Sequence, residues 1–405
     1  MKNVLLLAIY FPPRNQIASY RTGCFAKYLP ENGWMPTVVC EDWAPGNGIY
    51  DPDCVGVIPS EVQVIRIPNP RPKGFYQKVF LRKLLPYVFP HRSPHIWWQE
   101  TRRQVFSLLA SGRFDAIWAT SDPLTPLGLA AEASVRFRLP WIADIRDSYN
   151  VQPFGSWYKR PIWAFHERRL CRLAQRVFTV SPGLAEGLTV ATGRKVEVME
   201  NGFDPEMFGP AVTTHPKFTI VYTGALLPER NPQPLFEAMA RCVEQGLIPR
   251  SEIEVVFYGP PLKQLQPLIP SIAGGFPLRQ YDRISHQEIT SMQQNSTVLL
   301  MLAHAHEKGV LTGKIFDYLG AGRPILSIPD DHGDVTALLK RTGAGITAST
   351  VEEIMQVLVR WYNQWKTTGR IEITGNPDEI QYYSRKNQAR RLAGILDEIC
   401  ATPVA

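Results

Sequence analysis

Long apolar runs, paired cysteines and low-complexity stretches are missing from this chain of 405 residues. The longest apolar run, residues 4–11, is far shorter than the ~20 residues needed to cross a bilayer, so the sequence predicts no transmembrane helix. The six cysteines are scattered and none forms a C-x-x-C pair, which argues against a disulfide framework or a zinc site and suits a reducing cytoplasm. With 44% hydrophobic and 20% charged residues, the composition is that of a folded globular protein rather than a disordered chain.

The apolar start of the chain imitates a secretory signal peptide. However, Pro12-Pro13-Arg14 interrupts the run, and no small-x-small cleavage site follows closely. We therefore expect residues 4–9 to form a buried first strand, and the protein to be cytoplasmic.

The basic excess is small overall but concentrated in one stretch. The chain has 44 basic and 37 acidic residues, and residues 71–103 alone hold eight basic residues against one acid, Glu100. Aromatic residues are interleaved with them, and this combination favours an anionic membrane surface as a partner. The alternative is an ordinary surface helix whose aromatic residues pack inward. Nucleic acid is disfavoured because no recognition motif accompanies the patch. A second basic stretch, residues 159–176, would extend the same face.

Short β-rich apolar runs alternate with amphipathic helical patterns along the whole chain. The expected strands are 4–9, 37–40, 62–67, 116–119, 141–144, 177–180, 196–199, 218–222, 253–258, 298–302, 324–328 and 344–346. Such alternation predicts an α/β fold in which parallel sheets are covered by helices on both faces. Because it restarts near residue 217 after a polar stretch, we expect two doubly wound domains. Their expected ranges are 1–208 and 209–375, and a C-terminal helix within 376–405 would pack back on the N-terminal domain.

Familiar nucleotide and metal signatures are incomplete. The segment from Gly309 to Lys314 is one residue short of a P-loop, and no glycine fingerprint of a nicotinamide site follows the first strand. Asp51 and Asp53 have the spacing of a divalent-metal motif but follow a Gly/Pro-rich loop rather than a hydrophobic strand. These patterns predict neither a nicotinamide enzyme nor a metal site.

The most informative stretch is residues 298–326. It predicts a buried strand, a loop, and a helix that opens near Gly313 and ends near Gly322. A helix N-terminus with small residues favours a phosphate or diphosphate, and Lys314 adds a full positive charge. Asp317 lies one turn further on, where a carboxylate would accept hydrogen bonds from both hydroxyls of a ribose. The spacing therefore predicts a nucleoside diphosphate site; the alternative is a plain helix with a solvated lysine.

Two further loops follow predicted strands. In residues 222–231, Gly224 permits a close approach of the backbone to a ligand, and Arg230 would bind phosphate oxygens through its planar guanidinium. In the first half, Arg146 and Asp147 follow the strand that ends near Asp144. The alternatives are a helix cap for Asp147 and an internal ion pair for Arg146.

Taken together, these motifs resemble those of the retaining GT-B glycosyltransferases of family 4, over nearly the whole chain. The matching features are, in chain order, Tyr10-Phe11-Pro12-Pro13 with Arg21 and Leu29, Asp144-Ile145-Arg146-Asp147, Val180-Ser181-Pro182-Gly183, Asn201-Gly202-Phe203-Asp204, Tyr222-Thr223-Gly224, Gly313-Lys314 with Asp317, and Gly322-Arg323-Pro324. The resemblance implies an α/β, GT-B fold in which two doubly wound, Rossmann-like domains face a central cleft. It also implies a nucleotide-sugar donor held mainly by the second domain, an acceptor entering through the first, transfer with retention of anomeric configuration, and no obligatory metal or other cofactor.

The resemblance assigns roles to residues of the second half. Asp317 matches the ribose-binding glutamate of the family, and Arg230 matches the basic residue that contacts the diphosphate. Thr312 and Gly313 match the backbone cradle for the phosphates. Arg230 and Lys314 are the residues expected to stabilise the leaving diphosphate, which makes them the catalytic candidates.

This sequence departs from the family pattern at two positions. Gly309 stands where the family often has a glutamate that holds the donor sugar, and Glu307 is close but out of register. Ala225 replaces the arginine that often follows the glycine of the first loop. His304 and His306 are the remaining candidates for contacts to the sugar.

We therefore expect a glycosyltransferase that builds a cell-surface polysaccharide or glycolipid, with Arg146 and Asp147 on the acceptor side. Its partners would be a nucleotide-sugar donor, a glycan or lipid-linked acceptor, and the inner face of the membrane. A transferase that decorates a soluble natural product is one alternative. A non-catalytic binding or scaffold protein of the same fold is the other, motivated by Gly309 and Ala225.

Overall fold

The computed structural model divides into two compact units. The described residues are 1–43, 50, 58–69, 89–92, 95–121, 123–151, 160–209, 216–226, 230–259, 278–282, 284–303 and 311–402. Unit 1 comprises Met1–Glu200 and Arg385–Ala405, and unit 2 comprises Asn201–Ser384. Unit 1 therefore ends before the expected boundary at residue 208, and the chain returns to it at Arg385 rather than near residue 376.

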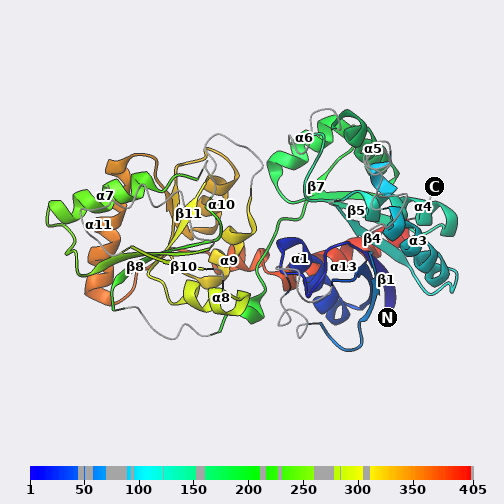
Figure 1. Cartoon of the computed structure of the whole chain (residues 1–405), viewed down its shortest axis with the longest axis horizontal. Helices are drawn as coiled ribbons and strands as arrows, with labels where there is room; N and C mark the ends of the chain where they lie inside the picture. Colours follow the sequence, from blue (N-terminus) through cyan, green and yellow to red (C-terminus); the bar gives the residue numbers. More distant parts are fainter. Residues whose placement is uncertain are drawn as a thin grey trace, which may run out of the picture. The chain divides into compact units, whose positions relative to one another are not determined.

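Within its described residues, unit 1 is built on a parallel sheet of seven strands (Figure 1). The strands are β1 (Lys2–Leu7), β2 (Trp34–Glu41), β3 (Gln63–Ile67), β4 (Ala116–Thr120), β5 (Trp141–Ile145), β6 (Arg176–Thr179) and β7 (Glu197–Val198). Their order is β3-β2-β1-β4-β5-β6-β7. Strands β2 and β3 are added on one side of β1 and strands β4 to β7 on the other, so the strand order reverses between β1 and β4. In doubly wound sheets ligands bind at the carboxyl ends of the strands next to such a switch point.

Helices cover both faces of this sheet. The first face carries α3 (His95–Leu109), α4 (Thr125–Phe137), α5 (Arg160–Leu173) and α6 (Pro182–Thr192), and the second carries α1 (Ile17–Tyr28) and α13 (Arg385–Ala401). Two further short 3-10 helices are η1 (Pro30–Asn32) and η4 (Pro90–Arg92). Alternate residues of β1 supply the two cores: Leu5 and Leu7 pack on the first face, Val4 and Leu6 on the second. The C-terminal helix α13, red in Figure 1, lies against α1 in unit 1.

Unit 2 repeats the same construction with a parallel sheet that has six strands among its described residues. The strands are β8 (Phe218–Thr223), β9 (Ile253–Tyr258), β10 (Leu278–Tyr281), β11 (Val298–Leu302), β12 (Ile325–Ile328) and β13 (Gly345–Thr347). Their order is β10-β9-β8-β11-β12-β13, which puts the switch point between β8 and β11.

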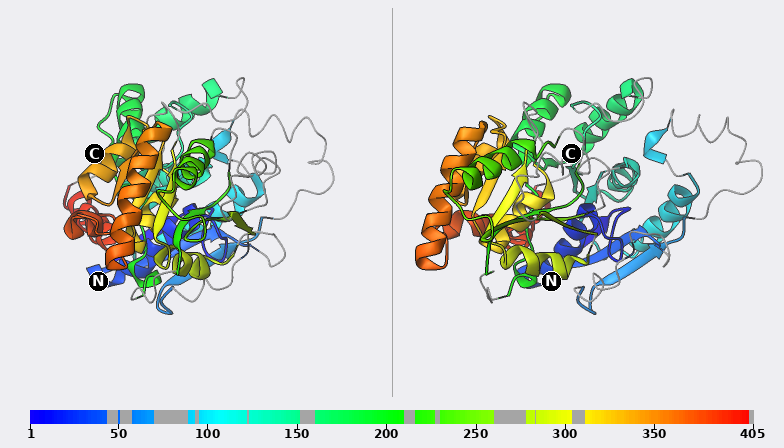
Figure 2. Two further views of the ribbon diagram at one scale, coloured as in Figure 1. Left: turned by 90° about the vertical axis from the view of Figure 1, so that its left-hand side faces the viewer. Right: turned by 60° about the vertical axis from the view of Figure 1, so that its left-hand side comes forward.

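The helices of unit 2 also form two layers. One layer consists of α7 (Gln233–Glu244) and α11 (Val351–Thr368), which pack on each other and appear in green and orange in Figure 2. The other contains α9 (Gly313–Ala321) and α10 (Asp334–Thr342). The remaining elements are α8 (His286–Gln294), α12 (Pro377–Tyr382) and the 3-10 helix η5 (Pro205–Met207).

Each strand expected from the sequence is present. The central strands are the apolar runs that are buried on both faces of a parallel sheet. One strand, β10, was not expected. Its residues alternate between partly buried and exposed, and among the described strands it pairs only with β9. A short edge strand in which two polar residues lie between Leu278 and Tyr281 lacks the apolar signal that identifies central strands.

Candidate functional site

The residues predicted to bind a nucleoside diphosphate lie on both sides of the switch point of unit 2. Strand β8 ends at Thr223 and is followed by Gly224, while β11 leads to α9, which begins at Gly313 as the sequence predicts. We call Tyr222, Gly224, Arg230 and the first turn of α9 the switch-point site. Loops and helix N-termini at this edge are the usual ligand contacts of doubly wound sheets.

Lys314, in the first turn of α9, extends over the aromatic ring of Tyr222. Its Nζ donates a hydrogen bond of 2.8 Å to the Tyr222 hydroxyl and lies 4.1 Å from the ring centroid. Gly224 has a φ of +109°, and a Cβ added there would come within 3.0 Å of Lys314 Nζ. Glycine is therefore favoured at this position, both by the backbone conformation and by the space that the lysine occupies.

The electrostatics of the switch-point site favour an anion. Burial lowers the pKa of Lys314 well below its usual value of 10.5, and the positive charge of Arg230 lowers that pKa further. Among the described residues, no carboxylate lies within ion-pair distance of the Lys314 ammonium. Two cations that repel each other in a partly buried site are stabilised when an anionic group binds between or beside them.

Arg230 and Tyr222 converge on one backbone oxygen. Arg230 Nη1 donates to the carbonyl of Ala225 at 3.3 Å, and the Tyr222 hydroxyl donates to the same carbonyl at 3.0 Å. The Arg230 guanidinium lies close enough to Lys314 to lower the pKa of that lysine. A guanidinium held in this way offers further N–H donors in the planar arrangement that matches phosphate oxygens.

The N-terminus of α9 has an unusual cap. Thr312 has the extended backbone of an N-cap residue, but its side chain does not bond to the helix. Its Oγ1 is buried and has no hydrogen-bond partner among the described residues. N-cap threonines normally satisfy one of the first N–H groups of the helix, so this end keeps both the hydroxyl and N–H groups available for a ligand.

Asp317 lies one turn beyond Lys314 and is partly exposed. Its Oδ2 is 3.9 Å from Nε2 of His286, the first residue of α8. A carboxylate is stabilised near a helix N-terminus by the helix dipole. The Asp317 side chain can therefore accept further hydrogen bonds at the surface of unit 2, as ribose binding requires.

A buried tyrosine fixes α9 relative to the loop after β8. The Tyr318 hydroxyl accepts a hydrogen bond from the Thr223 backbone N–H at 3.0 Å, and Gln293 Nε2 donates to the Thr223 hydroxyl at 3.1 Å. Tyr318 is fully buried, and burial raises the pKa of its hydroxyl. Tyr318 and Gln293 could not be identified from the sequence, because no local signal indicates partners that are 95 and 70 positions away.

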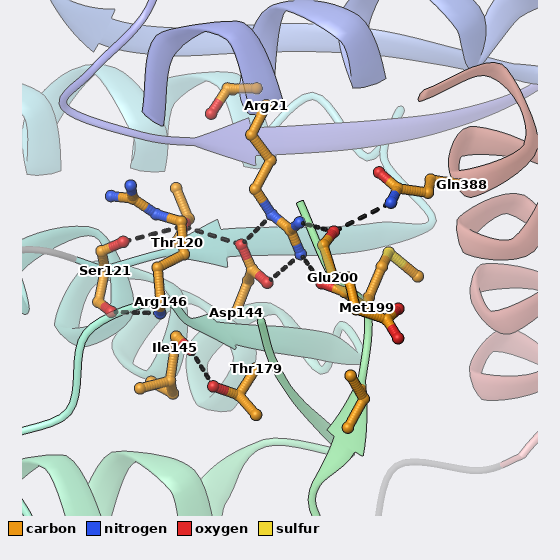
Figure 3. Close-up of polar contacts among 12 residues, drawn as sticks. Arg21, Thr120, Ser121, Asp144, Ile145, Arg146, Thr179, Met199, Glu200 and Gln388 are labelled. Carbon is orange, nitrogen blue, oxygen red and sulfur yellow. Dashed lines mark hydrogen bonds and ion pairs between the residues drawn. The ribbon is translucent and has the colours of Figure 1, made fainter. Parts of the chain in front are cut away.

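In unit 1, the motif that contains Asp144 is internal (Figure 3). Both oxygens of Asp144 accept hydrogen bonds from Arg21, Nε to Oδ2 at 2.9 Å and Nη2 to Oδ1 at 2.7 Å, and both side chains are inaccessible to solvent. Arg21 also donates to the backbone carbonyls of Met199 and Glu200. The pair thus ties α1 and β5 to the end of the first segment of unit 1.

The internal ion pair therefore belongs to Arg21 rather than to Arg146, which the sequence offered as an alternative. Arg146 Nε donates to the Thr120 hydroxyl at 3.0 Å, and its backbone N–H donates to the Ser121 hydroxyl at 3.3 Å (Figure 3). Arg146 and Asp147 are partly exposed and follow the carboxyl end of β5. Their acceptor-side role stays a prediction.

The other predicted sugar contacts, His304, His306 and Glu307, lie outside the described residues, as do Gly309 and the Asp51–Asp53 pair. Most of the basic stretch 71–103 also lies outside them. In the described part of the chain, no three His, Cys, Asp or Glu side chains come together as a metal-ligand set. No helix there is long and apolar enough to cross a membrane.

One family model matches the N-terminal half of the chain. Residues 19–202 match the family model of a glycosyl transferase 4-like domain, which covers most of unit 1. No curated protein matches the sequence significantly.

Solved structures match the whole chain at low sequence identity. HepE of Anabaena, determined with UDP and glucose, is 15% identical with a TM-score of 0.66, covering 98% of this chain and 100% of that one. A glycosyltransferase of Rickettsia africae is 13% identical with a TM-score of 0.66, covering 98% of each chain. A UDP-N-acetylglucosamine 2-epimerase, described as putative in its name, from Listeria monocytogenes is 13% identical with a TM-score of 0.58, covering 99% and 98%. The chain has the GT-B fold of two Rossmann-like domains, and its residues 19–202 match a glycosyl transferase 4-like domain.

Proposed function

We propose that this protein is a glycosyltransferase that moves a sugar from a nucleotide-diphosphate donor to an acceptor with retention of anomeric configuration. The observation that carries the proposal is the switch-point site. Arg230 lies close enough to Lys314 to lower its pKa, and among the described residues no carboxylate binds Lys314. Asp317 lies one helical turn away, as a ribose carboxylate would. The match of residues 19–202 and the UDP complex of HepE support the same donor class.

The chemistry explains why two cations would be needed. When the bond between the anomeric carbon and the diphosphate breaks, negative charge develops on the leaving phosphate and positive charge on the sugar ring. Lys314, Arg230 and the N-terminus of α9 would stabilise that leaving group, and preorganised charges in a partly dehydrated site do so effectively. Their own repulsion in the free protein decreases as the charge develops, which favours the transition state over the ground state.

The remaining bond changes balance without a strong protein base. The acceptor oxygen attacks the anomeric carbon from the face that the diphosphate leaves, so the configuration is retained. The proton of the acceptor hydroxyl passes to an oxygen of the departing phosphate, and the nucleoside diphosphate is released. Arg146 and Asp147 would position the acceptor, which we propose belongs to a cell-surface polysaccharide or glycolipid.

Ligand binding is the first test. A thermal-shift screen of nucleoside diphosphates and their sugars should reveal one base that stabilises the protein, because a ligand at a hundred times its Kd adds about 2.7 kcal/mol. The variants Lys314→Met and Arg230→Ala should lose that response. Lys340→Met, which changes an exposed lysine of the same unit, is the matched control. A response that persists in the first two variants would place the nucleotide elsewhere.

Product analysis then separates the reactions that share this fold. An epimerase of the Listeria type would change the sugar nucleotide without an acceptor, whereas a transferase requires one. Proton NMR of the product shows directly whether the anomeric configuration of the donor is kept. A protein that binds the nucleotide sugar but neither hydrolyses nor transfers it would be the non-catalytic alternative.

A membrane-bound acceptor is supported by the basic surface of unit 1. The second basic stretch forms α5, on which Arg169 and Arg172 are exposed and Phe165 and Leu173 are 56% and 45% exposed. The only acid of α5, Glu167, is buried, where it accepts hydrogen bonds from Ser148 and the Tyr149 N–H. The outward face of α5 is therefore cationic and partly apolar, as contact with an anionic lipid surface requires.

Vesicle co-sedimentation tests this contact. Replacing Arg168, Arg169 and Arg172 by glutamine should weaken binding to phosphatidylglycerol vesicles by on the order of a hundredfold, since each basic residue near the surface contributes about 1 kcal/mol. The same measurement applies to glutamine variants within 71–103. Vesicles of phosphatidylcholine alone should not bind the protein. A soluble acceptor is favoured if the parent protein shows no preference between the two lipids.

A further inference from the structure

A second cation that forms no ion pair with the described residues lies in unit 1, at the carboxyl ends of β1 and β2. Arg14 follows β1 and is enclosed between two aromatic rings: its Cζ is 3.9 Å from the ring centroid of Tyr10 and 3.8 Å from that of Trp43. Tyr10 follows β1 and Trp43 follows β2. Since β1 is one of the two strands at the switch point of unit 1, this cluster lies at the edge where ligands bind in such sheets.

Tyr10 accepts a hydrogen bond from the Arg14 side chain, but two buried donors of the cluster lack an acceptor among the described residues. Arg14 Nε and Trp43 Nε1 are both buried, and neither has a hydrogen-bond partner in the described part of the chain. Among the described residues, no carboxylate lies within ion-pair distance of the guanidinium. Glu41 at the end of β2 is close enough to affect Arg14 electrostatically, but its Oε1 already accepts a hydrogen bond of 2.6 Å from Asn69. Buried donors in native proteins are nearly always paired, so two unpaired ones in one cluster require an explanation.

The loop that carries Arg14 is held firmly. Phe11 is fully buried in the core of unit 1, and Arg66 Nη2 donates to the carbonyl of Pro12 at 2.8 Å. Helix α1 passes so close that a Cβ at Gly23 would come within 3.0 Å of the Pro12 ring. The guanidinium is therefore positioned before any ligand arrives, which reduces the entropy that binding would cost.

The burial of Arg14 also affects the pKa of its guanidinium. Burial lowers the pKa of its guanidinium, while Glu41 and Tyr10 act in the opposite sense without overcoming that effect. An arginine used only for stability would be expected to have a paired carboxylate, as Arg21 has in the same unit. The stacked rings orient the planar side chain, but they supply no negative charge.

We propose that the Arg14 cluster binds an anionic group, a carboxylate or a phosphate, of the ligand that unit 1 receives. The partly exposed guanidinium and the Trp43 indole N–H are donors only, so they match a group that is an acceptor only. If the proposed function holds, this ligand is the acceptor, which then carries an acidic sugar or a phosphate. The anion site itself does not depend on the donor site in unit 2.

Titration with small anions tests the site directly. In protein labelled with ¹⁵N at tryptophan, the Trp43 indole resonance is assigned with Trp43→Phe, and glucuronate, inorganic phosphate and glucose are added in turn at constant ionic strength. Glucuronate or phosphate should shift this resonance, and neutral glucose should not. Arg14→Gln should lower the affinity for the anion by about tenfold or more, because a charge-assisted hydrogen bond is lost. Arg113→Gln, which changes an exposed arginine of unit 1, should leave binding unchanged.

The outcomes are distinct. A response to glucuronate alone indicates an acidic sugar, a response to phosphate alone indicates a phosphorylated acceptor, and either supports the site. No shift with either anion, or an equal shift in Arg14→Gln, overturns it. If Arg14→Gln does not fold, Arg14→Lys replaces it. This variant keeps the charge but loses the planar guanidinium, so it should bind glucuronate more weakly than the parent protein does. Nucleoside diphosphate binding, measured in the same Arg14 variant, should match the parent protein, so failure of the donor assignment would be recognised separately.

Discussion

The two units each enclose a basic side chain, but they treat its charge in opposite ways. In unit 1, Arg21 is fully buried and makes two hydrogen bonds to Asp144, and its remaining donors reach backbone carbonyls. In unit 2, Lys314 bonds to a neutral tyrosine hydroxyl and lies near another cation. The first arrangement satisfies the charge inside the protein, whereas the second leaves it to be satisfied by something that binds.

This difference separates structural from functional charges more clearly than burial does. A buried, fully paired ion pair holds elements together, and removal of one partner leaves an uncompensated charge. A cation that is dehydrated without a counter-ion reduces stability in the free protein and is retained at sites where an anion arrives. By this criterion Arg14 resembles Lys314 and differs from Arg21.

The largest effect is expected for the paired charge. Asp144→Asn should lower the free energy of unfolding by about 3–5 kcal/mol, because Arg21 remains buried without its counter-ion. Chemical denaturation measures the change. The exposed pair between Arg102 and Glu132 provides the control, since Glu132→Gln should cost less than about 1 kcal/mol. Equal costs for the two variants would mean that the buried pair is not what stabilises unit 1.

The charges of the switch-point site should respond in the opposite sense. Lys314→Met and Arg230→Ala are each expected to lower turnover by about ten- to a thousandfold, in line with the loss of one group that stabilises the leaving diphosphate. Lys314→Met should not lower the free energy of unfolding at neutral pH, because a dehydrated charge is removed. Steady-state kinetics measure the change in turnover, and chemical denaturation of the same samples measures the free energy of unfolding. A loss of stability in Lys314→Met would show that the lysine is structural.

The dependence on pH gives a sharper form of the same comparison. Because the pKa of Lys314 is lowered in the folded protein, the unfolded chain binds more protons between that lowered pKa and 10.5, so stability should rise with pH across this window. A bound diphosphate should raise the pKa again, so binding takes up a proton there. Calorimetry in two buffers with different ionisation enthalpies measures the uptake, which Lys314→Met should abolish. Identical binding enthalpies in the two buffers would contradict the expected proton uptake.

The smallest effect is expected at Gly224. Gly224→Ala combines a backbone strain of about 1–2 kcal/mol with a Cβ that displaces the Lys314 ammonium. We expect donor affinity to fall several-fold, in proportion to the displaced charge interaction. In Gly246→Ala the φ is also positive, +70°, but the space around the new methyl group is open. That control should lose stability without losing donor affinity, and equal donor affinity in the two variants would contradict the role of the space at Gly224.

Local sequence signals predicted much of the architecture. The helix from Gly313 to a turn at Gly322 was expected because small residues follow a buried strand and a glycine suits the left-handed cap, where φ is +65°. Strand β10 was missed since its alternating exposure carries little apolar signal. The partner of Asp144 was also missed, because Arg21 lies 123 positions away and the nearer Arg146 offered a local pair.

By itself, the sequence determined that two α/β domains follow each other and that a lysine begins the helix after β11, because strand periodicity and helix signals depend on neighbouring residues. Only the tertiary structure decided which charges are paired. Whether Arg21 meets a carboxylate, Lys314 a tyrosine, or Arg14 two aromatic rings depends on side chains brought from distant positions. Desolvation and counter-ions are properties of the packed surroundings, and they set the chemistry of each of these cations.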